Sequence, residues 1–276
     1  MIFALSIGGQ SNSIDQSPHK SGFITANDVK LHYLDWGGKG ETMLFLHGIG
    51  DTPHSFDDFA PKFTNHFRVL GLTRRGHGES DVPRSGYDTA TRVEDIRQFL
   101  NALNIERAVL VVFSAAGVEV TMFAAKHPDR IIKAVYLDAI FDAGGQVALR
   151  TQGIPPELDR PETAGVRDSR QSKALELMAV GEAHTDYKAI RSPVLAIVVV
   201  GYPSNMLNRL KNLPLQRRQV VDEFLAERDA VKKNETDRFR KELPSAQVVM
   251  LTNAEHACFI DREGDVLREM RAFLMK

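Results

Sequence analysis

A serine at the end of an apolar run is the residue of this chain best suited to chemistry. The run Ala108–Phe113 is typical of a buried strand, and it stops at Ser114, which small residues follow. A serine on a tight turn between a strand and a helix presents its hydroxyl at the carboxyl edge of a sheet, beside the N–H groups that begin the helix. The pattern therefore predicts a nucleophile at Ser114.

The usual form of such a turn is G-x-S-x-G, and this chain matches it in part. Val112 stands two residues before the serine, and Ala116 stands two residues after it. A serine that follows an apolar run is also a common cap of an ordinary helix. Both interpretations of Ser114 remain open on this local pattern.

The segments around the serine alternate between predicted strands and helices. Near the N-terminus, the dipeptide Asn27-Asp28 separates two strand-like runs and predicts an antiparallel hairpin. Further strands are predicted at Thr42–Leu46, Phe67–Leu72, Ala108–Phe113, Ile131–Leu137, Pro193–Val200 and Gln247–Leu251. The alternation predicts an α/β fold with a mostly parallel central sheet flanked by helices, whose ligand sites lie at the carboxyl ends of the strands.

Capping patterns and apolar spacing predict the helices. Residues Thr91 to Glu94 are typical of a capping box that opens a helix, in which apolar residues then recur at helical spacing. A polar, helix-rich segment is predicted from about Leu215 to Leu243, and a closing helix has Val266, Met270 and Phe273 on one face.

The composition limits the classes of binding partner that we expect. The chain has 276 residues, with 35 Lys and Arg against 36 Asp and Glu and a formal net charge of -1. That balance gives no electrostatic reason to bind nucleic acid or an anionic membrane. The single cysteine, Cys258, excludes an internal disulfide. Because the sequence has no C-x-x-C or H-E-x-x-H spacing, we expect no bound metal, and we expect no cofactor. We expect a small-molecule substrate, and the sequence leaves the oligomeric state open.

Three regions are predicted along the chain. Residues 1–20 are predicted to form a disordered tail. Its apolar start lacks the basic region of a secretory signal. We therefore expect a cytoplasmic protein, or a periplasmic or secreted one if an export signal has been trimmed. No run reaches membrane-spanning length. Between residues 143 and 191 the strand rhythm stops, and a Gly- and Pro-bearing stretch precedes a predicted helix at Ser169–Val180. Residues 21–142 and 192–276 are predicted to form the core, and residues 143–191 an inserted helical lid.

Taken in order, these motifs resemble those of the α/β-hydrolase superfamily, in particular its bacterial esterase-like branch. The resemblance covers roughly residues 23–275 and implies the α/β-hydrolase fold. It rests on the hairpin, His47-Gly48-Ile49-Gly50 and Arg75-Gly76-His77-Gly78-Glu79-Ser80 at strand ends, the turn at Ser114, the lid insertion, Pro128-Asp129-Arg130, Tyr136-Leu137-Asp138-Ala139 and a late histidine before a final helix.

The resemblance also implies a catalytic triad. Triads of the family run nucleophile, acid and histidine along the chain, which makes Ser114 the nucleophile and His256 its base. Many relatives carry the acid after the strand equivalent to Val194–Val200, but the loop that follows it here holds no carboxylate. Other members place the acid after the strand that follows the nucleophile helix, where this chain has Asp138, with Asp142 as the reserve.

The oxyanion hole of the fold uses backbone N–H groups from the residue after the nucleophile and from the loop after the third strand. These positions correspond to Ala115 and Ile49. Gly48 and Gly50 would allow that loop to turn its N–H inward, since glycine tolerates unusual backbone angles. His47 is expected to brace the loop rather than to react.

Two residues depart from the family pattern at the turn. Val112 puts two methyl groups where relatives usually carry glycine, and Phe113 replaces a residue that is often polar. Crowding at Val112 could tilt the turn and separate the serine from its histidine, at a cost of about a hundredfold in rate. Arg74 and Arg75, which follow another strand, are expected to pair with carboxylates.

The implied activity is that of a serine hydrolase without a cofactor. It would cleave a small carboxylic ester through an acyl-enzyme, with Ser114, His256 and Asp138 as nucleophile, base and orienting acid. Apolar residues of the expected lid suit a moderately hydrophobic group: Ile154, Leu158, Leu175, Leu177 and Met178.

Several alternatives remain. One is a small-ligand-binding protein on the same fold with little or no turnover, and others are a carbon-carbon bond hydrolase, a lyase or an acyltransferase. A nucleotide-binding oxidoreductase is not supported, because Gly48 and Gly50 are not followed by a third glycine at G-x-G-x-x-G spacing, and Pro53 occupies that position.

Overall fold

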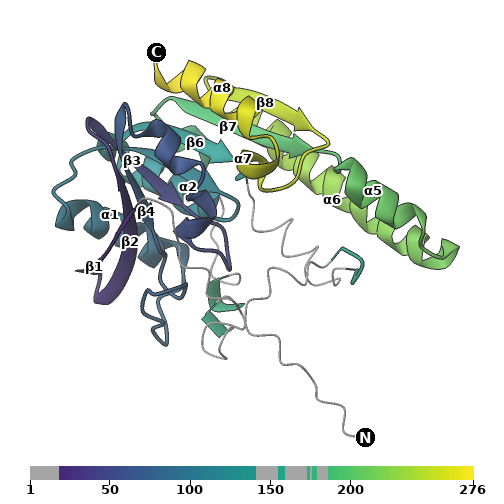
Figure 1. Ribbon diagram of the computed structural model, residues 1–276, viewed down its shortest axis with the longest axis horizontal. Helices are drawn as coiled ribbons and strands as arrows, with labels where there is room; N and C mark the ends of the chain where they lie inside the picture. The colour runs from purple at the N-terminus through teal and green to yellow at the C-terminus, as the bar shows by residue number, and fades with distance from the viewer. Residues whose placement is uncertain (1–18, 141–154, 159–172, 175, 179–185) are drawn as a thin grey trace, which may run out of the picture.

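The computed structural model describes residues 19–140, 155–158, 173–174, 176–178 and 186–276 (Figure 1). The predicted tail up to residue 18, the reserve acid Asp142 and most of the segment 143–191 lie outside these residues. Among the expected lid side chains, Ile154 and Leu175 lie outside them as well. The described residues cover most of the predicted core.

A mostly parallel sheet organises the described part of the chain. It has eight strands in the order β1-β2-β4-β3-β5-β6-β7-β8. β1 pairs with β2 and β2 with β4 in antiparallel fashion, and the remaining pairs are parallel. The strands are β1 (Lys20–Ala26), β2 (Val29–Gly37), β3 (Glu41–Leu46), β4 (Phe67–Leu72), β5 (Ala108–Phe113), β6 (Ile131–Leu137), β7 (Val194–Val200) and β8 (Gln247–Thr252). The predicted parallel sheet with an N-terminal antiparallel hairpin is confirmed.

The hairpin turns at the predicted dipeptide. Asn27 and Asp28 both adopt positive φ angles, 52° and 60°. A two-residue turn of this kind matches the right-handed twist of the flanking strands, and Asn and Asp tolerate it better than other residues with a Cβ. The turn therefore sets the pairing of β1 with β2, from Ala26 opposite Val29 to Lys20 opposite Asp35.

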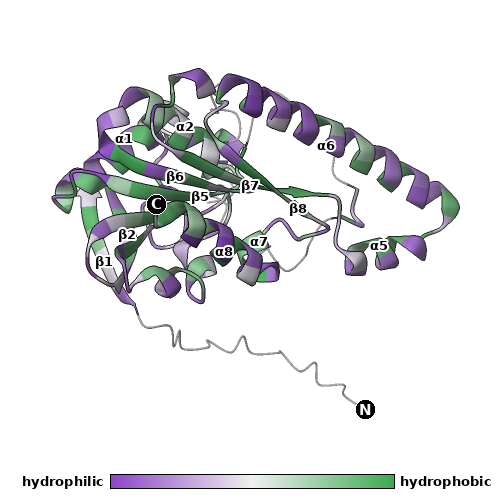
Figure 2. Cartoon of the chain, turned by 90° about the horizontal axis from the view of Figure 1, so that it is seen from above, coloured by the Kyte–Doolittle hydropathy of each residue, from purple (hydrophilic) through white to green (hydrophobic). Residues whose placement is uncertain are grey.

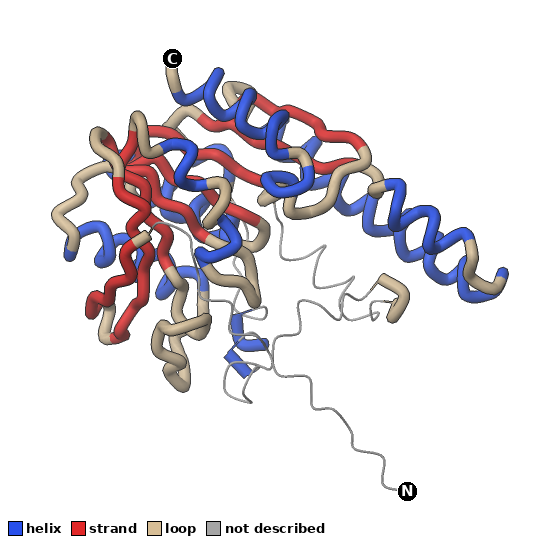
Figure 3. The backbone as a smooth tube through the Cα atoms, in the orientation of Figure 1, coloured by secondary structure: helices blue, strands red, loops and turns tan. Residues whose placement is uncertain are grey.

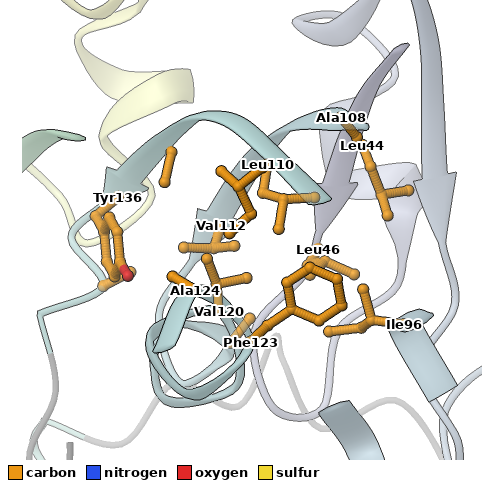
Figure 4. Close-up of a cluster of buried hydrophobic side chains, with 14 of the residues drawn as sticks. Leu44, Leu46, Ile96, Ala108, Leu110, Val112, Val120, Phe123, Ala124 and Tyr136 are labelled. Atoms are coloured by element: carbon orange, nitrogen blue, oxygen red, sulfur yellow. The ribbon is translucent and has the colours of Figure 1, made fainter. Parts of the chain in front are cut away.

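Helices cover both faces of the sheet (Figure 3). α1 (Thr89–Ala102) and α2 (Ala116–Lys126) pack on one face, and α8 (Glu263–Leu274) packs on the other. Coloured by hydropathy, the central strands are largely apolar whereas the helices mix apolar and polar residues (Figure 2). Figure 4 shows part of the hydrophobic core between the sheet and helices α1 and α2. The residues labelled there include Leu44, Leu46, Ile96, Leu110, Val112, Val120 and Phe123. A large side chain buried in this way stabilises the fold by about 1.5–3 kcal/mol.

The start of α1 differs from the prediction. The capping box predicted from Thr91 and Glu94 is wrong, because the helix begins at Thr89 with Asp88 as its N-cap. The Asp88 carboxylate accepts hydrogen bonds from the Thr91 backbone N–H at 2.9 Å and from its hydroxyl. Aspartate caps helices at least as well as threonine, while Glu94 pairs with Arg97 instead.

The longest helix, α6 (Leu215–Glu242), is predominantly polar and follows α5 (Ser204–Lys211) (Figure 1). Its C-terminal part is anchored by Phe239, whose ring lies 6.0 Å from that of Tyr136 and 4.8 Å from that of Tyr187. Residues seven apart lie on the same face of a helix, so this anchor also turns Lys232 toward the sheet. In the described part of the chain, no helix is both long and apolar enough to span a membrane.

Candidate active site

Ser114 occupies the turn between β5 and α2 in a backbone conformation unusual for a residue with a Cβ. Its φ is 57°, and its N–H donates to the carbonyl of Leu137 at 3.3 Å. Such a left-handed residue is typical of strained turns at functional sites. The backbone packs tightly at this turn because Gly117 has no Cβ. A Cβ on Gly117 would lie 1.8 Å from the carbonyl oxygen of Ala139.

His256 lies in the loop between β8 and α7 (Cys258–Asp261) and contacts the serine. Its Nε2 is 2.9 Å from Ser114 Oγ, and its Nδ1 is 2.7 Å from Asp138 Oδ2. Because an ionised carboxylate only accepts, Nδ1–H donates to Asp138 and Nε2 accepts from the serine hydroxyl. The Phe113 ring packs against the imidazole, with the centroids 4.7 Å apart and the planes tilted by 40°.

Asp138 follows β6, with a φ of 46° and a side chain that is 4% exposed. Its Oδ1 accepts from the Val199 N–H at 2.9 Å, and Lys232 Nζ lies 2.6 Å from Oδ1 and 2.8 Å from Oδ2. Burial raises the pKa of Asp138, but the Lys232 ammonium and the hydrogen bond from His256 outweigh burial and lower it to about 2. The carboxylate is therefore ionised at neutral pH.

The structure thus brings together Ser114, His256 and Asp138, the three residues named from the sequence. It adds Lys232, which sequence reasoning missed. This lysine is 94 positions from Asp138 and stands among many charged residues of α6, so no local pattern distinguishes it.

The expected crowding at Val112 does not separate Ser114 from His256. Its side chain is fully buried and points into the α1 and α2 side of the core (Figure 4), whereas Phe113 belongs to the cluster on the opposite face. Alternate residues of a strand point to opposite faces, so the two methyl groups face away from Phe113 and the histidine it contacts. The contact between Ser114 and His256 is intact at 2.9 Å.

The loop after β3 borders the serine. A Cβ on Gly48 would lie 3.0 Å from Ser114 Cβ, and Gly50 has a φ of 78°. The Gly50 N–H donates to His77 Nε2 at 3.0 Å. Ile49 lies between these glycines and packs against the small apolar cluster of Tyr87, Ala174 and Met178. Ala115 is the N-cap of α2, directly after Ser114.

His47 is fully buried at the base of the same loop. Its Nε2 accepts from the Arg74 N–H at 3.1 Å, and its Nδ1–H donates to the Gly48 carbonyl at 2.8 Å. Burial, followed by the nearby His77 and Arg74, lowers the pKa of His47 well below its usual value. The neutral imidazole therefore hydrogen-bonds to both the loop after β3 and the loop after β4.

The prediction that Arg74 and Arg75 pair with carboxylates is confirmed. Arg75 makes two hydrogen bonds to buried Asp95, and Arg74 lies 3.3 Å from Glu119. Burial raises the pKa of Asp95, and Arg75 opposes that effect. These arginines fasten the loop after β4 to the helices beneath it.

One further group of side chains has ligands for a metal ion. Within the residues that the structure describes, His19, His54 and Asp57 bring their ligand atoms within 4.8 Å of one another. They share no residue with the chain of hydrogen bonds from Ser114 to Asp138.

Known proteins resemble this chain in sequence and in fold. The family model described as the alpha/beta hydrolase fold matches residues 41–167. A non-heme chloroperoxidase of Streptomyces lividans is 33% identical over 141 residues, which cover 50% of this chain and 51% of that protein. A bifunctional esterase/perhydrolase of Acinetobacter calcoaceticus is 31% identical over 143 residues, with the same coverage of each. The chain thus spans about half the length of these curated relatives.

Solved structures extend the likeness in fold to almost the whole chain. The structure of E-2-(acetamidomethylene)succinate hydrolase superposes with a TM-score of 0.72 at 20% identity and covers 94% of this chain and 100% of its own. A thermophilic esterase from Thermogutta terrifontis gives a TM-score of 0.68 at 19% identity, covering 93% of this chain and 98% of its own. With its parallel sheet, its strand-turn-helix at Ser114 and the family model that matches residues 41–167, this chain has the α/β-hydrolase fold.

Proposed function

We propose that this protein is a serine hydrolase that cleaves small carboxylic esters through an acyl-enzyme. The observation that carries the proposal is the continuous chain of hydrogen bonds from Ser114 through His256 to Asp138. The relative described as a bifunctional esterase/perhydrolase supports the choice of an ester as substrate.

In the proposed reaction, Ser114 Oγ attacks the ester carbonyl carbon while His256 Nε2 takes its proton. The buried Asp138 carboxylate holds the imidazole in the required tautomer and stabilises the imidazolium that forms. The imidazolium then protonates the departing alkoxide, and water, activated by the same imidazole, releases the acid and restores the serine.

The oxyanion of the tetrahedral intermediate is assigned to the backbone N–H groups of Ile49 and Ala115. Two observations support this role: Gly48 lies against Ser114, and Ala115 begins a helix whose positive end favours an anion. The apolar surroundings of Ile49, with Met178 fully buried nearby, favour a moderately hydrophobic acyl or alcohol group. Met178 belongs to the segment 143–191, which we assign as the lid over this site.

A fluorophosphonate probe and p-nitrophenyl acetate test the proposal. We expect one covalent adduct per chain, mapped to Ser114 by mass spectrometry, and steady ester turnover. Ser114→Ala should lose the adduct and lower kcat/KM by at least about a thousandfold. The exposed Ser245 lies in a distant turn, so Ser245→Ala is a matched control that should behave as the wild type.

A ligand-binding protein without catalytic activity would give different results in these assays. A folded wild-type protein that takes up no probe and hydrolyses no ester would refute the hydrolase proposal and favour a ligand-binding role. An adduct at Ser114 together with negligible ester turnover would keep the nucleophile but point to another reaction of the superfamily, such as acyl transfer.

A further inference from the structure

A second cluster of reactive side chains lies at the edge of the sheet where the hairpin begins. His19 directly precedes β1, while His54 lies in the short helix η1 (Pro53–Phe56) and Asp57 ends that helix. His54 Nδ1 is 2.8 Å from Asp57 Oδ2, and His19 Nδ1 is 3.7 Å from Asp57 Oδ1. The two imidazole rings meet edge to face, with centroids 5.2 Å apart.

These distances suit a transition-metal ion. Zinc binds imidazole nitrogen and carboxylate oxygen at about 2.0–2.2 Å, which places neighbouring ligands of a tetrahedral site roughly 3.3 Å apart. The two nitrogen–oxygen separations from the histidines to Asp57, 2.8 Å and 3.7 Å, lie on either side of that value. Small side-chain rotations would therefore bring the ligands to one ion. Two imidazoles with one carboxylate favour zinc, nickel, cobalt or copper over magnesium or calcium.

The carboxylate is held in place from behind. The indole N–H of Trp36 donates to Asp57 Oδ1 at 3.0 Å, and Trp36 is itself buried. The Asp57 N–H donates to the His54 carbonyl at 3.1 Å, which fixes the spacing of the two ligands. A hydrogen bond to a ligating group, such as the one from Trp36, orients that group and is a regular part of metal sites.

Space for a fourth ligand lies beside His19. A hollow of about 350 Å³ is lined by His19, Lys20, Asp35, Trp36, Gly37, Gly38 and Arg68. The Arg68 guanidinium lies 3.1 Å from Asp35, so a carboxylate offsets its charge within the hollow. The hollow therefore leaves room for water beside His19, the one proposed ligand that lines it.

We propose that His19, His54 and Asp57 form a structural site for one divalent transition-metal ion of the zinc class. The ion would join the residue before β1 to the short helix that follows the β3 loop. Phe56 of that helix packs against Phe45 and Phe259, with ring centroids 5.0 Å and 4.8 Å apart. Metal binding would stabilise this corner of the fold, and it does not depend on the proposed hydrolase activity.

The fluorescence of Trp36 can be used to follow metal binding at this site. Trp36 is the single tryptophan, and it bonds directly to the proposed ligand Asp57. Full-length protein, freed of any tag and treated with EDTA, is titrated with Ni²⁺ while Trp36 fluorescence is recorded. We expect saturable quenching with one Ni²⁺ per chain, relieved by Zn²⁺ that competes for the site.

Variants separate this site from adventitious binding. His54→Ala and His19→Ala should each weaken Ni²⁺ binding at least tenfold, and Asp57→Asn should do the same. His66 is exposed outside the cluster, so His66→Ala is the matched control and should bind as the wild type. Circular dichroism establishes that each variant is folded before titration.

Thermal unfolding supplies a second measurement. Zn²⁺ should raise the unfolding midpoint of the wild type and of His66→Ala, and leave that of His54→Ala unchanged. The proposal is overturned if the wild type shows no saturable quenching, or if His54→Ala and Asp57→Asn bind Ni²⁺ as tightly as the wild type.

Discussion

Replacing Lys232 by methionine removes the cation from the buried Asp138 and keeps most of the side-chain volume. The ammonium lies 2.6 Å and 2.8 Å from the two carboxylate oxygens, and its side chain is only 27% exposed. Against burial, this cation and His256 lower the pKa of Asp138 from 3.8 to about 2. A shift of that size corresponds to about 2–3 kcal/mol of stability at neutral pH. We expect Lys232→Met to lower the free energy of unfolding by about that amount.

The expected loss depends on pH in a defined direction. The folded pKa of Asp138 lies below its unfolded value, so its contribution is complete above about pH 4 and disappears as the pH falls toward 2. The difference between Lys232→Met and the wild type should therefore be largest from pH 5 to 7 and shrink below pH 4. Urea unfolding followed by circular dichroism, repeated at each pH, measures it.

Lys233 provides the matched control on the same helix. It pairs with Asp237 at the surface, where the two side chains are 74% and 52% exposed. Because water screens such pairs, Lys233→Met should leave the stability at the wild-type value. Adding Asp138→Asn to Lys232→Met should recover part of the loss, since no buried charge then lacks its partner. If both lysine variants unfold alike at pH 7, or the loss persists unchanged at pH 3, the reasoning fails.

Three further substitutions test the site and its supports. Asp138→Asn should lower kcat/KM for p-nitrophenyl acetate by about ten-thousandfold, since the amide favours the wrong imidazole tautomer; a loss under tenfold would contradict the assigned role. Val112→Gly should cost about 2–3 kcal/mol in urea unfolding without raising kcat, because Val112 fills the core; a faster enzyme would show that valine does distort the turn. Gly117→Ala should cost about 3 kcal/mol or prevent folding, because its Cβ would meet the Ala139 carbonyl oxygen, and unchanged thermal unfolding would refute that contact.

Apolar runs bounded by polar or glycine residues located the strands with little error. β4, β5 and β6 begin and end at the predicted residues, because a central strand is largely buried on both faces and the apolar run stops where burial stops. The position of Ser114 follows directly, since a strand that ends at a serine places its hydroxyl at the sheet edge. Helix starts were predicted less accurately. Asp88 and Thr91 are both good caps, and in the structure Asp88 caps the helix by accepting from the Thr91 N–H.

The order of motifs along the chain was also enough to name His256 and Asp138 as partners of Ser114. That inference needed the resemblance to a family, since the serine and histidine are 142 positions apart and nothing local relates them. Only the tertiary structure could give the distances between these groups. It also shows that Val112 points away from the contact between Ser114 and His256.

Other contacts had no trace in the sequence at all. Lys232 is one of many charged residues of α6, and it reaches Asp138 because Phe239 anchors that face of the helix against the sheet. His19 meets His54 and Asp57 because β1 begins, and η1 ends, at the same corner of the fold. Local patterns determine which segments become strands and helices, since burial and backbone preference act over a few residues. Which side chains meet depends on how those elements pack, and packing is a property of the whole fold.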